Sequence, residues 1–446
     1  MAALRPTIGP VEIIGIHSSG KGITQWNDKK YYIPHTIPEE IVIAETQNSR
    51  RGFRTAVIQS IIKPSEYRIK AACPFYDKCG GCHFQHIRYA HQLRLKQSII
   101  QSAFNKYGIH YPVPDVTGAT ENFYYRNKVT FEISYSQDTA VIGFHPEWEN
   151  NSVIAIDECI IVQKNIHTFF QMLKPFMMAY IKEENISLIR RFTIRCNQKE
   201  EIMLVFELAL LPTKKFFSFI SQINKATAYS VAMYYFISKT NRNSIIDYIH
   251  IEKTPAYLYE TIENKTLRIS PATFFQNNME ITEKILRYIE EKIDFEKVSV
   301  MYDLYSGNGT LSMVLCQNKE TRIIGIEGNV VAVSDAIYNA TINKDCNSQY
   351  ICGDVLETFT ESFLVKHPKP DVIMLDPPRS GTLIEIQKNI LRIKPTFIVY
   401  VSCNPVSLAW NLSQLLQEYD LMNVQPFDMF PQTYQVETVV LLCRKH

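Results

Sequence analysis

The chain has 446 residues, and at about 100–200 residues per domain this length predicts two to four domains rather than one core. Hydrophobic residues make up 46% and charged residues 21%, which is a globular composition and excludes collagen, coiled coil and wholesale disorder. The net charge of +2 neither demands nor excludes a nucleic-acid partner. Its distribution is uneven, because residues 50–100 carry ten Lys and Arg against two acids, a local +8 that leaves −6 elsewhere.

The first residues and the ten cysteines bear on the compartment of the protein. Residues 1–10 contain two prolines and lack the apolar run of a signal peptide. No uncharged apolar run approaches the roughly 18 residues of a membrane span. We therefore expect a cytoplasmic, reducing location without a membrane partner, in which clustered cysteines favour a metal site over disulfides.

Short strand-like runs fill the first sixty residues and are separated by turn-forming Ser, Gly, Asn and Asp. They lie at 11–16, 30–33, 41–45 and 55–62. So many short strands in one segment predict a small β-barrel. Its basic loop at 50–54 contains Phe53, and cations beside aromatic rings suit single-stranded RNA. A solvated surface would show the same pattern, so this segment alone leaves both interpretations open.

The middle of the chain mixes helix and strand patterns. Residues 89–107 have apolar residues at helical spacing, which predicts a helix. Strand-like runs follow at 128–135, 141–145, 192–196 and 203–210, with amphipathic segments around 168–180 and 216–223. These patterns predict a mixed α+β central domain.

From about residue 269 the pattern becomes a regular alternation of helices and strands. Expected helices lie at 279–293, 311–317 and 330–343, and expected strands at 300–304, 323–327, 371–375, 397–402 and 436–443. This alternation predicts an α/β fold with a doubly wound sheet. Ligands bind such sheets at the carboxyl ends of the strands, so the residues that end each strand are the candidate site.

The first two strand ends favour an adenosyl ligand. Residues 303–309 contain Gly307 and Gly309 ahead of a helix, where glycines let the backbone approach a ligand. A dinucleotide fingerprint would require Gly or Ala where Ser312 stands, which favours a ligand without a pyrophosphate. Glu327 ends the next strand and is placed to accept hydrogen bonds from both hydroxyls of a ribose, although a lone acid there is more often solvated.

The later strand ends carry reactive side chains. One strand ends in Asp-Pro-Pro-Arg at 376–379, where the prolines stiffen an acid and a cation. The next ends in Ser-Cys-Asn-Pro at 402–405, just before a helix whose dipole is expected to lower the pKa of the Cys403 thiol. An isolated cysteine is more often a small buried hydrophobe. The segment 428–437 leads into the last strand and is expected to bring another carboxylate near the same edge.

Together these motifs resemble the S-adenosylmethionine-dependent RNA 5-methyluridine (uracil carbon-5) methyltransferases. The matching pieces are Phe-Phe-Gln at 274–276, the 303–309 loop, Glu327, 376–379, 402–405 and the 430–437 tail. The resemblance continues through Tyr-Arg-Asn-Lys at 125–128 and the cysteine cluster to the first barrel, which is similar to the OB-like TRAM module. It implies an RNA-binding TRAM barrel at 1–66, a central α+β domain at 67–260 and a Rossmann-like methyltransferase domain at 261–446. The helix near 89–107 is expected to pack on this last domain.

The resemblance also implies roles for individual residues. Cys403 is the expected nucleophile toward uracil carbon 6, Glu437 the expected base for the carbon-5 proton, and Arg379 a group for oxyanion charge or phosphate. The expected cofactor-binding residues are Gln276, Tyr305, Glu327, Asp354 and Asp376. The sequence departs from the family at Ser306, Thr310, Asn277 and Gln435, where Cys, Asn, Val and His are common. None is a catalytic group, but the cofactor contact of Thr310 and the orientation of Glu437 are put in doubt.

Three cysteines crowd into ten residues, and a fourth follows much later. They are Cys73, Cys79, Cys82 and Cys159. Their spacing suits zinc or a 4Fe-4S cluster, with free thiols as a third alternative. The resemblance to the ribosomal and archaeal branches of the family implies the 4Fe-4S cluster. We expect it to have a structural or RNA-positioning role, because methyl transfer needs no electron.

We therefore expect a monomeric enzyme that methylates carbon 5 of one uridine in RNA. A TRAM module together with a cluster favours 23S ribosomal RNA, and the T-loop uridine of transfer RNA is the alternative. The target uridine must be unstacked or flipped, which favours a loop. A cytosine carbon-5 methyltransferase and a non-catalytic RNA-binding protein are further alternatives, and the presence of both Cys403 and Glu437 argues against the latter.

Overall fold

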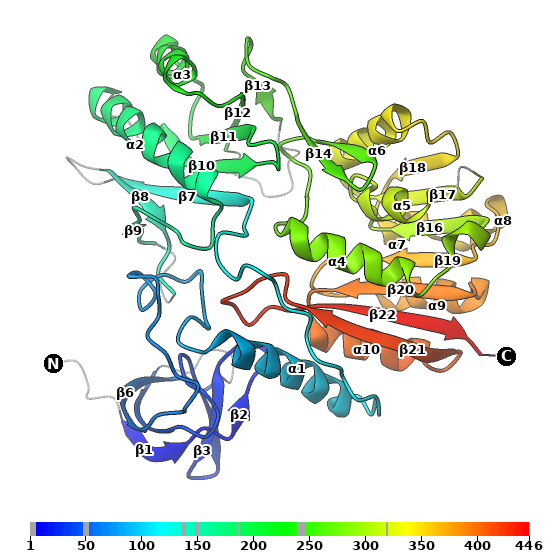
Figure 1. The fold of residues 1–446 in the computed structure, drawn as a ribbon, viewed down its shortest axis with the longest axis horizontal. Coiled ribbons are helices and arrows are strands. Elements are labelled where there is room, and N and C mark those ends of the chain that lie inside the picture. Colours follow the sequence, from blue (N-terminus) through cyan, green and yellow to red (C-terminus); the bar gives the residue numbers. More distant parts are fainter. Residues whose placement is uncertain are drawn as a thin grey trace.

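The computed structural model describes residues 6–47, 53–135, 140–147, 151–184, 188–238, 247–317 and 320–445. Three units follow one another along the chain: a small β unit, a sheet with two helices and a large α/β unit (Figure 1). Residues 50–52 of the predicted basic loop lie outside the described residues.

The N-terminal unit consists of two three-stranded sheets around one apolar core. Its strands are β1 (Thr7–Glu12), β2 (Gly15–Ile16), β3 (Gly22–Trp26), β4 (Lys29–Ile33), β5 (Ile41–Thr46) and β6 (Ala56–Lys63). The sheets have the orders β1-β5-β6 and β2-β3-β4. Ile8, Ile33 and Val42 are buried in the shared core because alternate strand residues face inward. The predicted strand at 11–16 is instead divided between β1 and β2, since the backbone of Ile13 bonds to Glu40 outside both strands.

The central unit is a mixed α+β layer, as the sequence predicts. It contains β7 (Lys128–Tyr135), β8 (Ala140–Phe144), β9 (Ile154–Ala155), α2 (Lys164–Glu184), β10 (Ile189–Cys196), β11 (Ile202–Leu208), α3 (Lys214–Ala226), β12 (Val231–Ile237) and β13 (Ile249–His250). The strand order is β13-β12-β11-β10-β7-β8-β9. Stacked Phe131, Phe170 and Phe192 join α2 to the sheet.

The C-terminal unit is the expected doubly wound sheet. After the hairpin β14 (Leu258–Ile262) and β15 (Lys265–Ile269), its strands are β16 (Val300–Leu304), β17 (Arg322–Glu327), β18 (Ser348–Cys352), β19 (Val372–Leu375), β20 (Phe397–Ser402), β21 (Tyr419–Phe427) and β22 (Glu437–Arg444). Its helices are α4 (Met279–Glu290), the 3₁₀ turn Phe295–Lys297, α5 (Thr310–Leu315), α6 (Val330–Ile342), α7 (Val355–Thr358), α8 (Glu361–Lys366), α9 (Ile384–Ile393) and α10 (Pro405–Leu415). The order is β18-β17-β16-β19-β20-β22-β21, and among these described strands only β22 runs opposite to the others, so its pairs with β20 and β21 are antiparallel.

Both faces of this sheet are apolar, which explains the nearly continuous hydrophobic strands. Met301 belongs to a core that includes residues of α4, α5 and α6 on one face, and its neighbour Tyr302 belongs to a core with residues of α1, α9 and α10 on the other. Helix α1 (Tyr89–Lys106) comes from far earlier in the chain, yet Phe104 shares a core with Leu412 of α10. The helix therefore completes the C-terminal unit.

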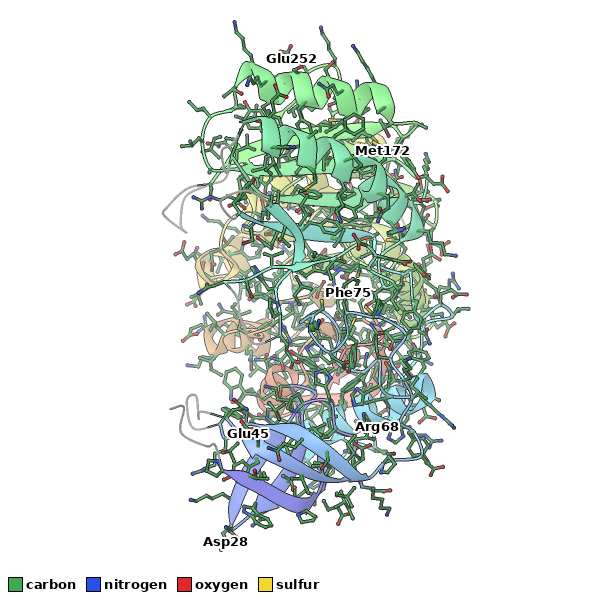
Figure 2. All side chains as sticks on the ribbon, turned by 90° about the vertical axis from the view of Figure 1, so that its left-hand side faces the viewer. Asp28, Glu45, Arg68, Phe75, Met172 and Glu252 are labelled. Atoms are coloured by element: carbon green, nitrogen blue, oxygen red, sulfur yellow. The ribbon has the colours of Figure 1, made fainter. Side chains whose placement is uncertain are left out.

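The segment 428–436 between β21 and β22 reaches away from its own sheet toward the N-terminal half of the chain (Figure 1). There Tyr434 packs beside Gly20, where an added Cβ would lie 2.6 Å from the tyrosine Cβ. Phe75 lines the same cavity as the clustered cysteines, and Figure 2 shows it between the N-terminal unit with Asp28 and the helices near Met172. Within the described residues, none of the helices has the length and apolar character required to cross a bilayer.

Candidate functional site

The glycine loop and Glu327 meet at the carboxyl edge of the sheet. The backbone N–H of Gly307 donates to Glu327 Oε2 at 3.0 Å, and that of Asn329 donates to Glu327 Oε1 at 2.7 Å. Both carboxylate oxygens are thereby fixed, and each keeps a lone pair for a further donor. Gly307 and Gly309 have φ of +56° and +80°, and a Cβ at Gly309 would lie 2.7 Å from the Tyr350 hydroxyl. The loop therefore requires glycine there.

Tyr305 and Asp354 lie beside this loop. The pKa of Tyr305 is raised to about 12, by burial and then by the negative charge of Asp354. Asp354 is exposed and caps α7 by accepting from the N–H of Leu356 at 2.8 Å. The structure thus brings two of the predicted cofactor residues to the same edge as Glu327.

Three buried acids influence one another at the sheet edge. Burial and the proximity of Glu327 raise the pKa of Asp303 to about 6, and burial and Asp303 raise that of Asp376 to about 7. Burial and Asp376 raise the pKa of Glu437 well above its ordinary value. Such a site favours the binding of a cation, because a positive charge would stabilise the ionised acids.

Cys403 lies next to Glu437 through the register of the strands. Ser402 pairs with Thr438 across β20 and β22, so the residues that follow and precede this pair are neighbours. The pKa of Cys403 is raised to about 12, first by burial and then by Glu437, while Arg379 acts to lower it. The expected lowering of this thiol pKa is therefore wrong for the free protein, because burial and neighbouring acids outweigh the helix start.

Hydrogen bonds connect the Asp-Pro-Pro-Arg motif at 376–379 to the Ser-Cys-Asn-Pro motif at 402–405. Asn404 caps α10 by accepting from the N–H of Val406 at 3.1 Å, and its Nδ2 donates to the Arg379 carbonyl at 2.7 Å. Ser407 Oγ donates to the same carbonyl at 3.1 Å. This arrangement holds the Asp-Pro-Pro-Arg loop against the start of the helix that follows Cys403.

The Phe-Phe-Gln segment is held by the central unit. Asn127 Nδ2 donates to the Gln276 carbonyl at 2.9 Å, and the N–H of Asn127 donates to the Asn277 carbonyl at 3.1 Å. The side chain of Phe274 is 61% exposed beside it. In the sequence, Asn127 is notable only as part of the Tyr-Arg-Asn-Lys motif at 125–128, and its basic neighbours do not predict this contact.

Asp428 begins the segment that leads to Glu437 and is held by helix α1. Its carboxylate forms an ion pair with Lys96 of α1, and both side chains are fully buried. Lys96 Nζ also donates to the Phe430 carbonyl at 3.0 Å. Asp428 therefore anchors the segment before Glu437, because a buried ammonium group needs an anionic partner.

The four predicted cluster cysteines line one cavity of about 630 Å³. Burial raises the pKa of every one of these thiols, and the charge of neighbouring cysteines adds to the rise at Cys79, Cys82 and Cys159. Among the described residues, no group of three or more His, Cys, Asp or Glu side chains is arranged to hold a metal ion. The metal cluster accordingly stays a prediction.

A mostly parallel sheet with an antiparallel last strand, a glycine loop and acids at its carboxyl edge defines a Rossmann-like methyltransferase. The family model described as tRNA (uracil-5-)-methyltransferase matches residues 88–445, and the chain belongs to this family. The protein is therefore an RNA methyltransferase.

Curated relatives resemble the chain over its whole length. An uncharacterized RNA methyltransferase of Bacillus cereus is 30% identical over 451 residues, which cover 98% of this chain and 96% of the relative. Another, from Bacteroides thetaiotaomicron, is 29% identical and covers 95% and 99% of the two chains. The crystal structure of Pyrococcus abyssi tRNA (uracil-54, C5)-methyltransferase in complex with S-adenosyl-L-homocysteine has the same fold, with a TM-score of 0.74 at 23% identity over 97% of this chain and 99% of that one.

Proposed function

We propose that this enzyme transfers a methyl group from S-adenosyl-L-methionine to carbon 5 of a specific uridine in RNA, through a covalent adduct between Cys403 and uracil carbon 6. The observation that carries the proposal is the pairing of Cys403 with Glu437 on adjacent strand ends. A nucleophile and a base are needed on the same ring, and this pairing supplies both.

Carbon 5 of uracil is a weak nucleophile, and Cys403 makes it reactive. The thiolate adds to carbon 6, forming an S–C bond and leaving enolate character at carbon 5. S-adenosylmethionine, when bound, would supply the methyl group to carbon 5 and leave as S-adenosylhomocysteine, whose sulfur is neutral. Arg379 lowers the pKa of the thiol and so favours the thiolate. Exclusion of water by the buried edge strengthens these charge effects.

Glu437 completes the reaction. After methylation it takes the carbon-5 proton, the electron pair re-forms the carbon 5–carbon 6 double bond, and the Cys403 sulfur leaves. Its pKa is raised by burial and by Asp376, which makes it a stronger base than an exposed carboxylate. Positioned base catalysis of this kind is typically worth about 100- to 10,000-fold.

The methyl donor is expected to contact Gln276, Tyr305, Glu327, Asp354 and Asp376. Three features support this assignment. The Glu327 oxygens keep free lone pairs, Tyr305 lies beside Asp354, and the pKa of Asp376 is raised to about 7 in an acidic site that suits a sulfonium. Tyr305, Glu327, Asp354 and Asp376 stand at the ends of four strands of one sheet, β16, β17, β18 and β19, and Gln276 precedes α4.

We also infer that Cys73, Cys79, Cys82 and Cys159 hold a 4Fe-4S cluster, with zinc as the alternative. Four thiols on one cavity supply the donor set of either group, and a bound cation would offset the mutual charge of the thiolates. The cluster would serve structure or RNA positioning. Protein purified anaerobically should contain iron and acid-labile sulfide, and zinc without sulfide would overturn the assignment.

For the RNA, we favour 23S ribosomal RNA, and the name of the Pyrococcus neighbour supports transfer RNA as the alternative. The N-terminal unit is proposed as a TRAM-like RNA-binding module at residues 1–66, followed by domains at 67–260 and 261–446 in a monomer. An aromatic group on this unit supports RNA binding: His17, Tyr32 and Phe53 have ring centroids 4.8–5.8 Å apart.

Covalent trapping tests the proposed chemistry. RNA containing 5-fluorouridine cannot lose a proton from carbon 5, so with methyl donor it should remain attached to the wild-type enzyme. Cys403→Ala should give no adduct. An equal adduct with that variant would overturn the nucleophile. Mapping 5-methyluridine in ribosomal and transfer RNA from a strain lacking the gene identifies the substrate, and loss from neither pool would refute the proposed function.

A further inference from the structure

Helix α6 carries the fully buried carboxylate of Asp335, which binds several groups of the short segment 268–273. Asp335 accepts hydrogen bonds only from the segment 268–273 among the contacts of the described residues. The donors and distances are Arg268 Nε at 2.6 Å, Ser270 N at 2.9 Å, Ser270 Oγ at 2.7 Å and Thr273 Oγ1 at 2.5 Å. Charge-assisted bonds of this kind are strong, so the carboxylate fixes the path of this segment.

One turn later, the same helix connects that segment to the glycine loop. Asn339 Oδ1 accepts from the N–H of Arg268 at 2.7 Å, and Asn339 Nδ2 donates to the Asn308 carbonyl at 3.1 Å. Asn308 Nδ2 in turn donates to the Arg268 carbonyl at 3.2 Å. The segment 268–273 and the loop that contains Gly307 and Gly309 are therefore held in register by a single helix.

The segment leads directly into Phe274 and Gln276, while Asp335 itself touches neither. Thr273 is the last fixed point before them: its hydroxyl bonds to Asp335, and its carbonyl accepts from buried Arg195 of the central unit at 3.3 Å. A buried ion pair by itself is weak evidence for a stabilising role. Here every donor to the Asp335 carboxylate among the described residues belongs to the segment 268–273, which leads into Phe274 and Gln276. The ion pair therefore positions this segment.

We propose that Asp335 is a positioning residue that sets residues 274–276 at a fixed distance from the glycine loop. These two segments form opposite faces of the proposed site, so Asp335 fixes the distance between the faces. The inference rests on the proposed function. It adds a group that none of the sequence motifs contains, 59 residues beyond Gln276 in the chain.

Two variants and a matched control test the role. Thr273→Val keeps the side-chain shape and removes one of the four bonds, and Asp335→Asn places an amide N–H against the donors. Asn343→Ala is the control. Asn343 caps the C-terminus of α6 and bonds to Thr266 N and O of the hairpin at 3.0 and 2.7 Å, away from residues 274–276.

With both substrates saturating, Thr273→Val and Asp335→Asn should each lower kcat by about ten-fold or more. Saturation fills the site but does not restore the correct distance between the bound reactants. The control should lower only the melting temperature. Hydrogen exchange at residues 273–277 should quicken in Thr273→Val and not in Asn343→Ala, a readout that needs no turnover. If Asp335→Asn fails to fold, Thr273→Val decides alone. Unchanged kcat and unchanged exchange would overturn the inference, whereas an inactive wild type would refute the proposed function instead.

Discussion

Gln92 of α1 and Gln432, in the segment before β22, hold each other by a reciprocal pair of hydrogen bonds. Gln92 Nε2 donates to Gln432 Oε1 at 2.9 Å, and the N–H of Gln432 donates to Gln92 Oε1 at 3.1 Å. The Gln432 carbonyl accepts from His83 and Phe84, each at 2.9 Å, next to the clustered cysteines. The segment that precedes Glu437 is therefore positioned by a helix and a loop that lie more than 300 residues earlier in the sequence.

Gln92→Leu should both destabilise the protein and slow it. The change leaves the Ile87 carbonyl and the Gln432 groups without this partner, whereas the Phe84 carbonyl keeps the N–H of Ile87, and each buried group left unsatisfied costs about 1–3 kcal/mol. Urea unfolding should reveal the loss, and kcat should fall because Glu437 is less well held. Gln97→Leu is the control, since Gln97 on the same helix bonds to Val113 instead. Equal effects of the two variants on kcat would contradict this reasoning.

The buried pair of Lys96 and Asp428 should behave differently when one or both partners are removed. Lys96→Met leaves an unpaired carboxylate with no exposed surface, which should cost about 3–5 kcal/mol of unfolding free energy. Combining it with Asp428→Leu removes both charges and should recover most of the loss. Denaturant titration of the two single variants and the double variant measures this coupling. A double variant as unstable as the sum of both singles would show that the charges do not act as a pair.

Two charged neighbours, the Glu437 carboxylate and the Arg379 guanidinium, shift the pKa of the Cys403 thiol in opposite directions. Glu437→Gln removes a negative neighbour and should lower the thiol pKa from about 12, whereas Arg379→Ala removes a positive neighbour and should raise it. Peptide-level mass spectrometry of iodoacetamide labelling against pH follows Cys403 apart from the other cysteines. Labelling at a given pH should be faster in Glu437→Gln and slower in Arg379→Ala. Shifts in the same direction would contradict the charge assignment.

The sequence predicted the elements whose pattern is local and repeated. Helix α1 was expected at 89–107 and spans Tyr89–Lys106, because its apolar spacing is regular. Strands β18 and β21 were not predicted: Ser348–Cys352 is half polar, and Tyr419–Phe427 contains Asp, Asn and Pro. They form strands because the apolar strands β17 and β22 offer them an open edge.

The sequence placed Glu327 and Cys403 at strand ends, because a motif and an apolar strand pattern coincide there, and their proposed roles stay predictions. What the sequence could not give were partners distant along the chain. Lys96 lies 332 residues from Asp428, and Asp335 lies in an ordinary-looking helix. The direction of the Cys403 pKa also depends on Glu437 across the sheet, which a local helix-start argument omits.

The pKa of Asp376 gives a pH test of the methyl-donor site. Burial and Asp303 raise this pKa to about 7 in the free protein, so the group is largely protonated below that pH. A bound sulfonium favours the carboxylate and lowers its pKa, so binding releases a proton below about pH 7. The affinity for S-adenosylmethionine should therefore rise with pH, by up to about ten-fold per unit, and level off above about 7.

S-adenosylhomocysteine provides the matched control because its sulfur carries no charge. Its affinity should change much less between pH 6 and 8 than that of the sulfonium ligand, and Asp376→Asn should abolish the step near 7 for S-adenosylmethionine. Calorimetry with both ligands at several pH values makes the comparison without RNA. Equal slopes for the two ligands would mean that Asp376 does not sense the sulfonium charge, and would remove it from the proposed donor site.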